Sequence, residues 1–250
     1  MSILFISDVH LCTKSPYITN GFLRFLNYRA MRAKALYILG DLFETWLGDD
    51  DCNLLHRNIA KALKSLHQKK ISCYFIHGNH DFLLGKKYAR ACGMTLLPSN
   101  QVLKLASGKK IIILHGDILC DNDGSYQLFR KCLRHIIVQR LFLSLPLSIR
   151  SRIFSAIRSC CIQHTKYKSK KKLNINLKTA TDILVQNHAD IMIHGHTHQP
   201  TMHKIYRSKK DVFRIIVLGC WDKYGSMIEV NEKNNDILFI EFPLGETIKY

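Results

Sequence analysis

Acidic residues are scarce in this sequence of 250 residues, which has 19 Asp and Glu against 37 Lys and Arg and a formal net charge of +18. Such an excess favours a polyanionic partner, and it leaves open nucleic acid, an anionic membrane surface and a phosphorylated substrate. Hydrophobic residues make up 47% of the chain, which excludes a disordered tail protein or a fibre. The length suits one large domain with a sizeable core.

Paired cysteine motifs and long apolar runs are missing as well. The nine cysteines include no CxxC pair, which argues against a zinc ribbon, and their odd number argues against a closed disulfide framework. Met1 runs directly into an apolar, strand-like segment, so no secretory leader is expected. The longest apolar stretch, Ile136 to Ile149, is interrupted by Pro146 and is shorter than the roughly 20 residues of a membrane span. We therefore expect a cytoplasmic protein in a reducing compartment.

The positive charge is concentrated in one segment. The 58 residues 124–181 contain 13 Lys and Arg and no acidic residue, which leaves a net charge of +5 for the rest of the chain. Apolar residues recur at helical spacing at 129–141 and at 149–160, with a break at Pro146. This pattern predicts two basic amphipathic helices in an insert, which suit an anionic lipid surface. An ordinary helical cap on the fold is the alternative interpretation.

Outside this insert, strand-like apolar runs alternate with helical patterns. The early runs, typical of strands buried on both faces, are at residues 3–6, 35–39, 73–76 and 111–114. Helical periodicity lies between them at 22–31 and 54–66. Later runs, bounded by turn residues typical of hairpins, are at 191–193, 213–218, 227–230 and 237–242. The order predicts the α/β class with a mixed sandwich, in a single domain spanning residues 1–250.

Five of the strand-like runs end in polar clusters. The clusters are Asp8-Val9-His10, Gly40-Asp41, Gly78-Asn79-His80-Asp81, His115-Gly116-Asp117 and Gly195-His196-Thr197-His198. Because open α/β sheets place their sites at the carboxyl ends of the strands, we expect these clusters to meet at one rim. The alternate side chains of Asp-x-His and His-x-His point to the same side if the chain stays extended.

The side chains in these clusters suit a metal site. Carboxylates, imidazoles and an amide without thiolates suit Mn²⁺ or a similar divalent ion better than a structural zinc ion. Two such ions, ~3.5–4 Å apart, would clamp a phosphoryl group and generate a water nucleophile. Asp41 is the natural bridging ligand, because a carboxylate offers two oxygens. One such cluster alone is most often a turn or a helix cap, but five in this order favour a metal site.

The motifs DxH, GDxxE, GNHD, HGD and GHTH resemble those of the calcineurin-like metallophosphoesterase superfamily. Within it, segments such as 36–51 and 73–85 are most similar to the family of UDP-2,3-diacylglucosamine pyrophosphohydrolases of lipid A biosynthesis. The resemblance covers most of residues 1–230. It implies two mixed β-sheets flanked by helices, two Mn²⁺ per chain, and hydrolysis of UDP-2,3-diacylglucosamine to UMP and 2,3-diacylglucosamine 1-phosphate. It also implies a peripheral position on the cytoplasmic side of the inner membrane, with no nucleic acid as partner.

The same resemblance implies roles for individual residues. The metal ligands would be Asp8, His10 and His198 at one ion and Asn79, His115 and His196 at the other, with Asp41 as the bridge. Catalytic roles fall to Asp41, Asn79 and His80. The implied substrate contacts are Asn79, His80, Asp123, Cys161, Thr165, Lys168 and His196. Three of these depart from the family pattern, since His80 replaces Arg, Cys161 replaces Ser and Thr165 replaces Asn; His80 matches the wider superfamily instead.

Two other interpretations remain open at this stage. A metallophosphoesterase acting on nucleic acid or nucleotides fits the net charge, and it predicts aromatic residues interleaved with the basic ones. A metal-free binding protein of the same fold is the second, and the intact set of seven ligands argues against it.

Overall fold

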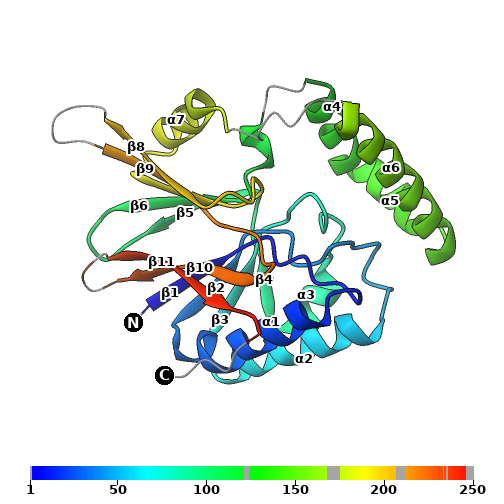
Figure 1. Cartoon of the computed structure of the whole chain (residues 1–250), viewed down its shortest axis with the longest axis horizontal. Coiled ribbons are helices and arrows are strands. Elements are labelled where there is room, and N and C mark those ends of the chain that lie inside the picture. Colours follow the sequence, from blue (N-terminus) through cyan, green and yellow to red (C-terminus); the bar gives the residue numbers. More distant parts are fainter. Residues whose placement is uncertain are drawn as a thin grey trace.

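The computed structural model describes residues 2–120, 124–167, 175–206, 212–232, 234 and 236–245. Two β-sheets pack face to face (Figure 1). The first contains β1 (Ser2–Ile6), β2 (Ala35–Ile38), β3 (Ser72–Phe75), β4 (Met94–Leu96), β10 (Tyr224–Asn231) and β11 (Ile237–Pro243), in the order β11-β10-β1-β2-β3-β4. The second contains β5 (Asn100–Lys104), β6 (Lys110–Leu114), β7 (Ile191–His194), β8 (Thr201–Tyr206) and β9 (Val212–Val217), in the order β5-β6-β7-β9-β8.

Both sheets are mixed, which confirms the predicted α/β sandwich. Strands β1 to β4 pair in parallel, and so do β6, β7 and β9. Antiparallel strands extend both sheets: β10 and β11 in the first, β5 and β8 in the second. The carboxyl ends of β1, β2 and β3 therefore lie along one edge, and those of β6 and β7 lie along the matching edge of the second sheet.

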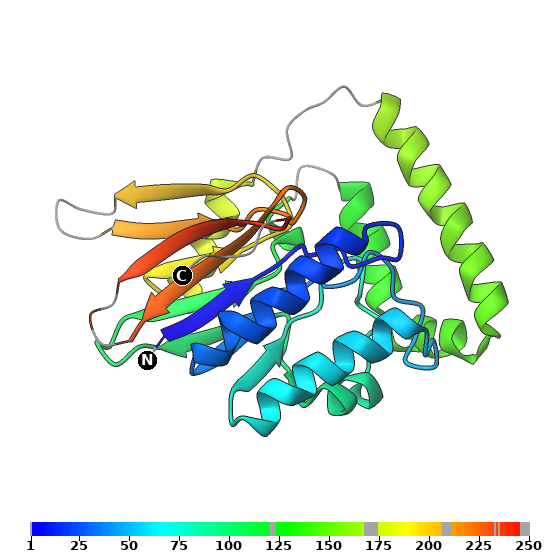
Figure 2. The same ribbon diagram turned by 60° about the horizontal axis from the view of Figure 1, so that its bottom comes forward.

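Alternating apolar residues build the core between the sheets. In β1, Ile3 and Phe5 belong to the cluster shared with β6 and β7, whereas Leu4 and Ile6 pack toward the helices. Helices α1 (Pro16–Tyr28), α2 (Leu54–Gln68) and α3 (Lys86–Cys92) cover the outer face of the first sheet, with the short η1 (Ala30–Arg32) (Figure 2). Helix α7 (Leu177–Gln186) and the short η2 (Asp117–Leu119) pack on the second.

The predicted strands and the two helices predicted outside the insert are confirmed, but β4, β5, β8, α3 and α7 were missed. Strand β8 has an exposed or half-buried pattern instead of an apolar run, and β4 has three residues. Strand β5 is half-buried along most of its length, and α3 has seven residues. Helix α7 lies at the end of the segment predicted as an insert. Elements of this kind lack the long apolar periodicity from which the others were predicted.

The basic segment forms three helices at one end of the sandwich, where the prediction was two (Figure 1). They are α4 (Gly124–Arg134), α5 (Ile136–Ser144) and α6 (Leu147–Tyr167), named together the helical insert. His135 adopts an extended conformation (ψ 130°) and separates α4 from α5. The break at Pro146 is confirmed, because the preceding Leu145 is extended, as residues before proline usually are.

A buried arginine at the start of α6 attaches the insert to the sandwich. The guanidinium of Arg150, 1% exposed, pairs with both carboxylate oxygens of Asp50, with Oδ1 at 2.9 Å. It also donates to the carbonyls of Leu47 and Leu145. The insert is therefore fixed beside the loop that follows β2. Among the described residues, no helix combines the length and the apolar character needed to cross a bilayer.

Candidate metal centre

The loops after five strands meet at the end of the sandwich that faces the insert (Figure 1). They supply Asp8 and His10 after β1, Asp41 after β2, Asn79 and His80 after β3, His115 after β6, and His196 and His198 after β7. Because β1, β2 and β3 are parallel to one another, and so are β6 and β7, their carboxyl ends bring these side chains together.

The backbone at these loops is left-handed, so the condition that the chain stays extended at Asp-x-His and His-x-His is not met. Five residues have positive φ: Asp8 (53°), His10 (51°), Asp41 (54°), His196 (71°) and His198 (59°). For residues with a Cβ, this conformation costs roughly 1–2 kcal/mol each. Such strain persists where the surroundings fix it, and it is concentrated at functional sites. These left-handed turns direct the alternate side chains to the rim. The hydrophobic periodicity of the sequence does not predict such turns.

The buried carboxylate of Asp81 holds two of these loops together. It accepts hydrogen bonds from the backbone N–H groups of Asp41 (3.3 Å), Leu42 (2.7 Å) and Gly78 (2.9 Å). Burial, followed by the charge of Asp41, raises the pKa of Asp81. The loop after β3 is thereby drawn against the loop after β2.

Glycine is required where loops approach each other most closely. A Cβ on Gly78 would lie 2.0 Å from Oδ1 of Asp41 and 2.5 Å from its backbone nitrogen. A Cβ on Gly195 would lie 2.1 Å from Oδ2 of Asp8. Real Cβ atoms do not come this close to other heavy atoms, so any side chain there would displace a carboxylate of the rim.

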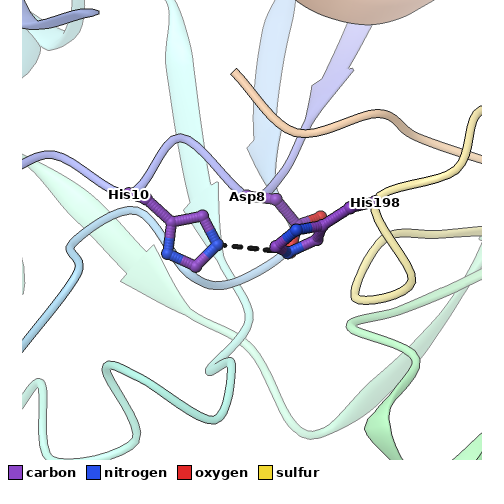
Figure 3. A group of neighbouring side chains, drawn as sticks. All are labelled: Asp8, His10 and His198. Carbon is purple, nitrogen blue, oxygen red and sulfur yellow. Dashed lines mark hydrogen bonds and ion pairs between the residues drawn. The ribbon is translucent and has the colours of Figure 1, made fainter. Parts of the chain in front are cut away.

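Asp8, His10 and His198 form the first cluster (Figure 3). The Nε2 atoms of His10 and His198 lie 3.2 Å apart, and Nε2 of His198 lies 3.4 Å from Oδ1 of Asp8. Oδ2 of Asp8 accepts from the Ser7 hydroxyl and the His196 N–H, whereas Oδ1 is buried without a hydrogen bond within the described residues. A buried carboxylate oxygen beside two imidazole nitrogens fits a divalent cation.

Asn79 and His115 form the second cluster, next to Asp41. Nε2 of His115 lies 2.9 Å from Oδ1 of Asn79 and 3.5 Å from Oδ2 of Asp41. The other ring nitrogen of His115 lies 2.8 Å from the Leu39 carbonyl, so Nδ1 carries the proton and Nε2 is left as the ligand atom. The His196 ring lies 5.1 Å from that of His115, between centroids.

Asp41 lies between the two clusters. Its Oδ2 is 3.9 Å from Nε2 of His10 in the first cluster and 3.5 Å from Nε2 of His115 in the second. Its Oδ1 accepts from the backbone N–H of His80 at 2.9 Å, which fixes the carboxylate plane. This is the position that a bridging ligand requires.

The electrostatics at the rim favour a bound positive charge. Burial opposes ionisation of Asp8, but its contact with His198 and the charge of His115 outweigh burial and lower the pKa of Asp8. Contacts with Asp8 and Cys220 raise the pKa of His198 to about 10. Burial lowers the pKa of His196 to about 4, so this imidazole is neutral near pH 7 and available as a ligand.

Glu44, which was not predicted as a functional residue, supports the histidines of the rim. Its Oε2 lies 2.9 Å from Nδ1 of His10, and its backbone carbonyl lies 2.8 Å from Nδ1 of His80. The rings of His10 and His80 meet edge to face at 4.8 Å. The signal was present in the GDxxE motif, three residues after Asp41.

A largely apolar pocket of about 300 Å³ opens beside Asn79 and His80. It lies between the helical insert and the loops after β2 and β3. Its lining residues are Trp46, Asn79, His80, Phe82, Leu83, Arg130, Leu133, Arg134, Val138, Gln139, Phe142, Phe154 and Ile157. The polar rim therefore continues directly into an apolar chamber.

The predicted substrate contacts divide into two groups. Asn79, His80 and His196 lie at the rim, and the first two also line the pocket. Asp123 and Lys168 lie outside the described residues, and so do the side chains of Cys161 and Thr165 in α6.

A model of the calcineurin-like phosphoesterase family matches residues 1–200. The chain belongs to this family. The UDP-2,3-diacylglucosamine hydrolase of Blochmanniella pennsylvanica is 89% identical to it over 250 residues, with both chains fully covered. The protein of that name from Escherichia coli (strain K12 / DH10B) is 46% identical over 97% of this chain and 100% of its own. A dimetal phosphatase from Danio rerio is 10% identical, with a TM-score of 0.48 over 98% of this chain and 96% of that one.

The close approach at Gly78 in this calcineurin-like phosphoesterase leads to a prediction. Gly78→Ala is expected to destabilise the chain by about 1–3 kcal/mol, because the new methyl group overlaps Asp41. Its binding of divalent metal is expected to weaken as well, since Asp41 moves. Urea denaturation and metal titration measure the two effects. Gly245→Ala is the matched control, because a Cβ there meets no atom within 4 Å; equal behaviour of the two variants would contradict the prediction.

A second prediction concerns the number of protons that the chain releases when it binds a metal ion. With its pKa raised to about 10, His198 holds a proton at pH 7.5, and it must lose that proton to bind a metal ion. Binding of Mn²⁺ to the metal-free chain should therefore release about one proton more in the parent than in His198→Gln. Calorimetric titration in buffers of different ionisation enthalpy measures this number. Equal proton release from both proteins would show that His198 is neutral before binding.

Proposed function

We propose that the chain hydrolyses the pyrophosphate bond of UDP-2,3-diacylglucosamine, giving UMP and 2,3-diacylglucosamine 1-phosphate, in lipid A biosynthesis. The observation that supports this most is the continuity of the polar rim with the apolar pocket, both of which include Asn79 and His80. A substrate in which a diphosphate links uridine to a sugar with acyl chains matches both surfaces. The names of the relatives that align over their full length point to the same substrate.

The proposed cofactors are two Mn²⁺ ions. The donor set fits them, because it combines carboxylate, imidazole and amide groups with a buried Asp8 oxygen that lacks a hydrogen bond within the described residues. Asp8, His10 and His198 would hold one ion, Asn79, His115 and His196 the other, and Asp41 both. When bound, the ions would polarise the phosphoryl group and lower the pKa of a water molecule.

Protein groups would orient the diphosphate and move the proton. Asn79 and His196 stand where they can hold phosphoryl oxygens at the rim. His80 donates from Nδ1 to the Glu44 carbonyl, so its Nε2, when protonated, can give a proton to the leaving oxygen. Asp123, Cys161, Thr165 and Lys168 complete the proposed contacts on the side of the insert.

The outer face of the insert suits a membrane surface. Four of its apolar side chains are more than half exposed: Leu128 (71%), Ile136 (56%), Ile137 (58%) and Leu141 (65%). Lys131 and Arg140 are exposed on the same helices. Apolar side chains flanked by basic ones bind the interface of anionic bilayers. We infer a peripheral position on the cytoplasmic side of the inner membrane, where a lipid-linked substrate would be accessible.

Loss of the bridging carboxylate tests the proposed reaction. Asp41→Ala is expected to lower the rate of UMP release from UDP-2,3-diacylglucosamine, with Mn²⁺ present, by about a hundredfold or more. Asp182→Ala, an exposed position in α7, should keep the parent rate. Full activity in Asp41→Ala would eliminate the bridging role, and a parent chain that binds Mn²⁺ without releasing UMP would eliminate the proposed substrate.

A flotation experiment tests the membrane surface. Replacing both Ile136 and Ile137 by Asp should reduce binding to vesicles of phosphatidylglycerol and phosphatidylethanolamine by about tenfold or more, because apolar contact is lost and negative charge is added. Val185→Asp in α7 makes a similar change at a residue 49% exposed outside α4, α5 and α6, and it should bind like the parent. Equal flotation of all three proteins would place the membrane contact elsewhere.

A further inference from the structure

Arg134 in α4 reaches from the insert to two of the loops that carry candidate metal ligands. Its Nη2 donates to the backbone carbonyl of Gly78 and to Oδ2 of Asp117, each at 3.0 Å. Gly78 directly precedes Asn79, and Asp117 is the second residue after His115. The Arg134 guanidinium therefore forms hydrogen bonds to both loops, each at a residue no more than two positions from a candidate metal ligand.

Asp117 receives this contact as part of a larger polar junction. Its carboxylate is 4% exposed, and it also pairs with Arg130, whose Nη2 lies 3.3 Å from Oδ1. Gln127 donates to the carbonyls of Asp117 (3.0 Å) and Cys120 (3.2 Å). Gln127, Arg130 and Arg134 are spaced three and four residues apart, so they share one face of α4. This face rests on the loop after β6.

The separation of Asn79 and His115 depends on contacts between the two loops. Asn79 follows β3 of the first sheet and His115 follows β6 of the second, so pairing of strands within a sheet does not set their distance. Nevertheless Oδ1 of Asn79 lies 2.9 Å from Nε2 of His115. A planar guanidinium that bonds the backbone of one loop and the carboxylate of the other is suited to fix such a separation.

We propose that Arg134 is a positioning residue that sets the distance between Asn79 and His115, and that it thereby strengthens metal binding at the second cluster. The proposal rests on the proposed function in one respect, that the rim is a metal centre. The alternative is that Arg134 only attaches the insert, as Arg150 does through Asp50 in the loop after β2.

Metal titration of the full-length, metal-free chain distinguishes these possibilities without any substrate. For Arg134→Met, Co²⁺ titration followed by its visible spectrum should show one of two binding steps weakened by about tenfold to a hundredfold, with the other unchanged. Arg134→Lys should give an intermediate loss, because the ammonium keeps the charge but lacks the planar fork. If Arg134→Met does not fold by circular dichroism, Arg134→Lys decides the question.

Two control variants separate positioning from charge and from docking. Lys131→Met makes the same charge change at an exposed position of α4, and Asp50→Asn weakens the other attachment of the insert. Both should bind Co²⁺ like the parent. Parent affinity in the Arg134 variants, or an equal loss in Asp50→Asn, would overturn the proposal. Hydrolysis of UDP-2,3-diacylglucosamine is assayed separately, so a wrong substrate would leave the metal-binding comparison intact.

Discussion

The geometry of the candidate metal centre depends on one buried carboxylate, that of Asp81. It accepts hydrogen bonds from three backbone N–H groups in the loops after β2 and β3. These bonds draw the two loops so close that position 78 has no room for a side chain. Asp41 is held between the two clusters as a result. A hydrogen-bonded group at the base of the loops thus determines where the outer ligands stand, although it offers no ligand atom itself.

The insert converts this rim into a site for an amphiphilic molecule. Helices α4, α5 and α6 supply most of the apolar lining of the pocket, while the body supplies Asn79 and His80 at its polar end. Phe142 and Phe154 of the insert face this chamber, so their rings are placed for contact with aliphatic chains. Among the basic side chains that the structure describes in these helices, Arg130 and Arg134 line the pocket, whereas Lys131, Arg140, Arg150 and Arg152 do not.

The sequence predicted the strands that have continuous apolar runs, and the convergence of their polar ends, because such runs leave clear local patterns. It did not predict the left-handed turns at Asp8 and His10, since these are imposed by contacts between loops. Nor did it predict the part played by Arg134, whose partner Gly78 lies 56 residues away. Helical spacing identifies an apolar face, but it does not show which body residues the polar face will meet. The break between α4 and α5 at His135 was also missed, because the helical spacing of apolar residues continues across it.

The lack of acidic residues in 124–181 means that the insert has no counter-charge of its own. Its described ion pairs are made to Asp117 and Asp50, which lie outside the insert. Attraction to these two carboxylates holds the insert in place, whereas the basic residues within the insert repel one another. Added salt screens both. It weakens the repulsion among the basic residues of the insert, and it also weakens the ion pair between Arg150 and the exposed carboxylate of Asp50. Ionic strength therefore has two opposed effects on this part of the molecule.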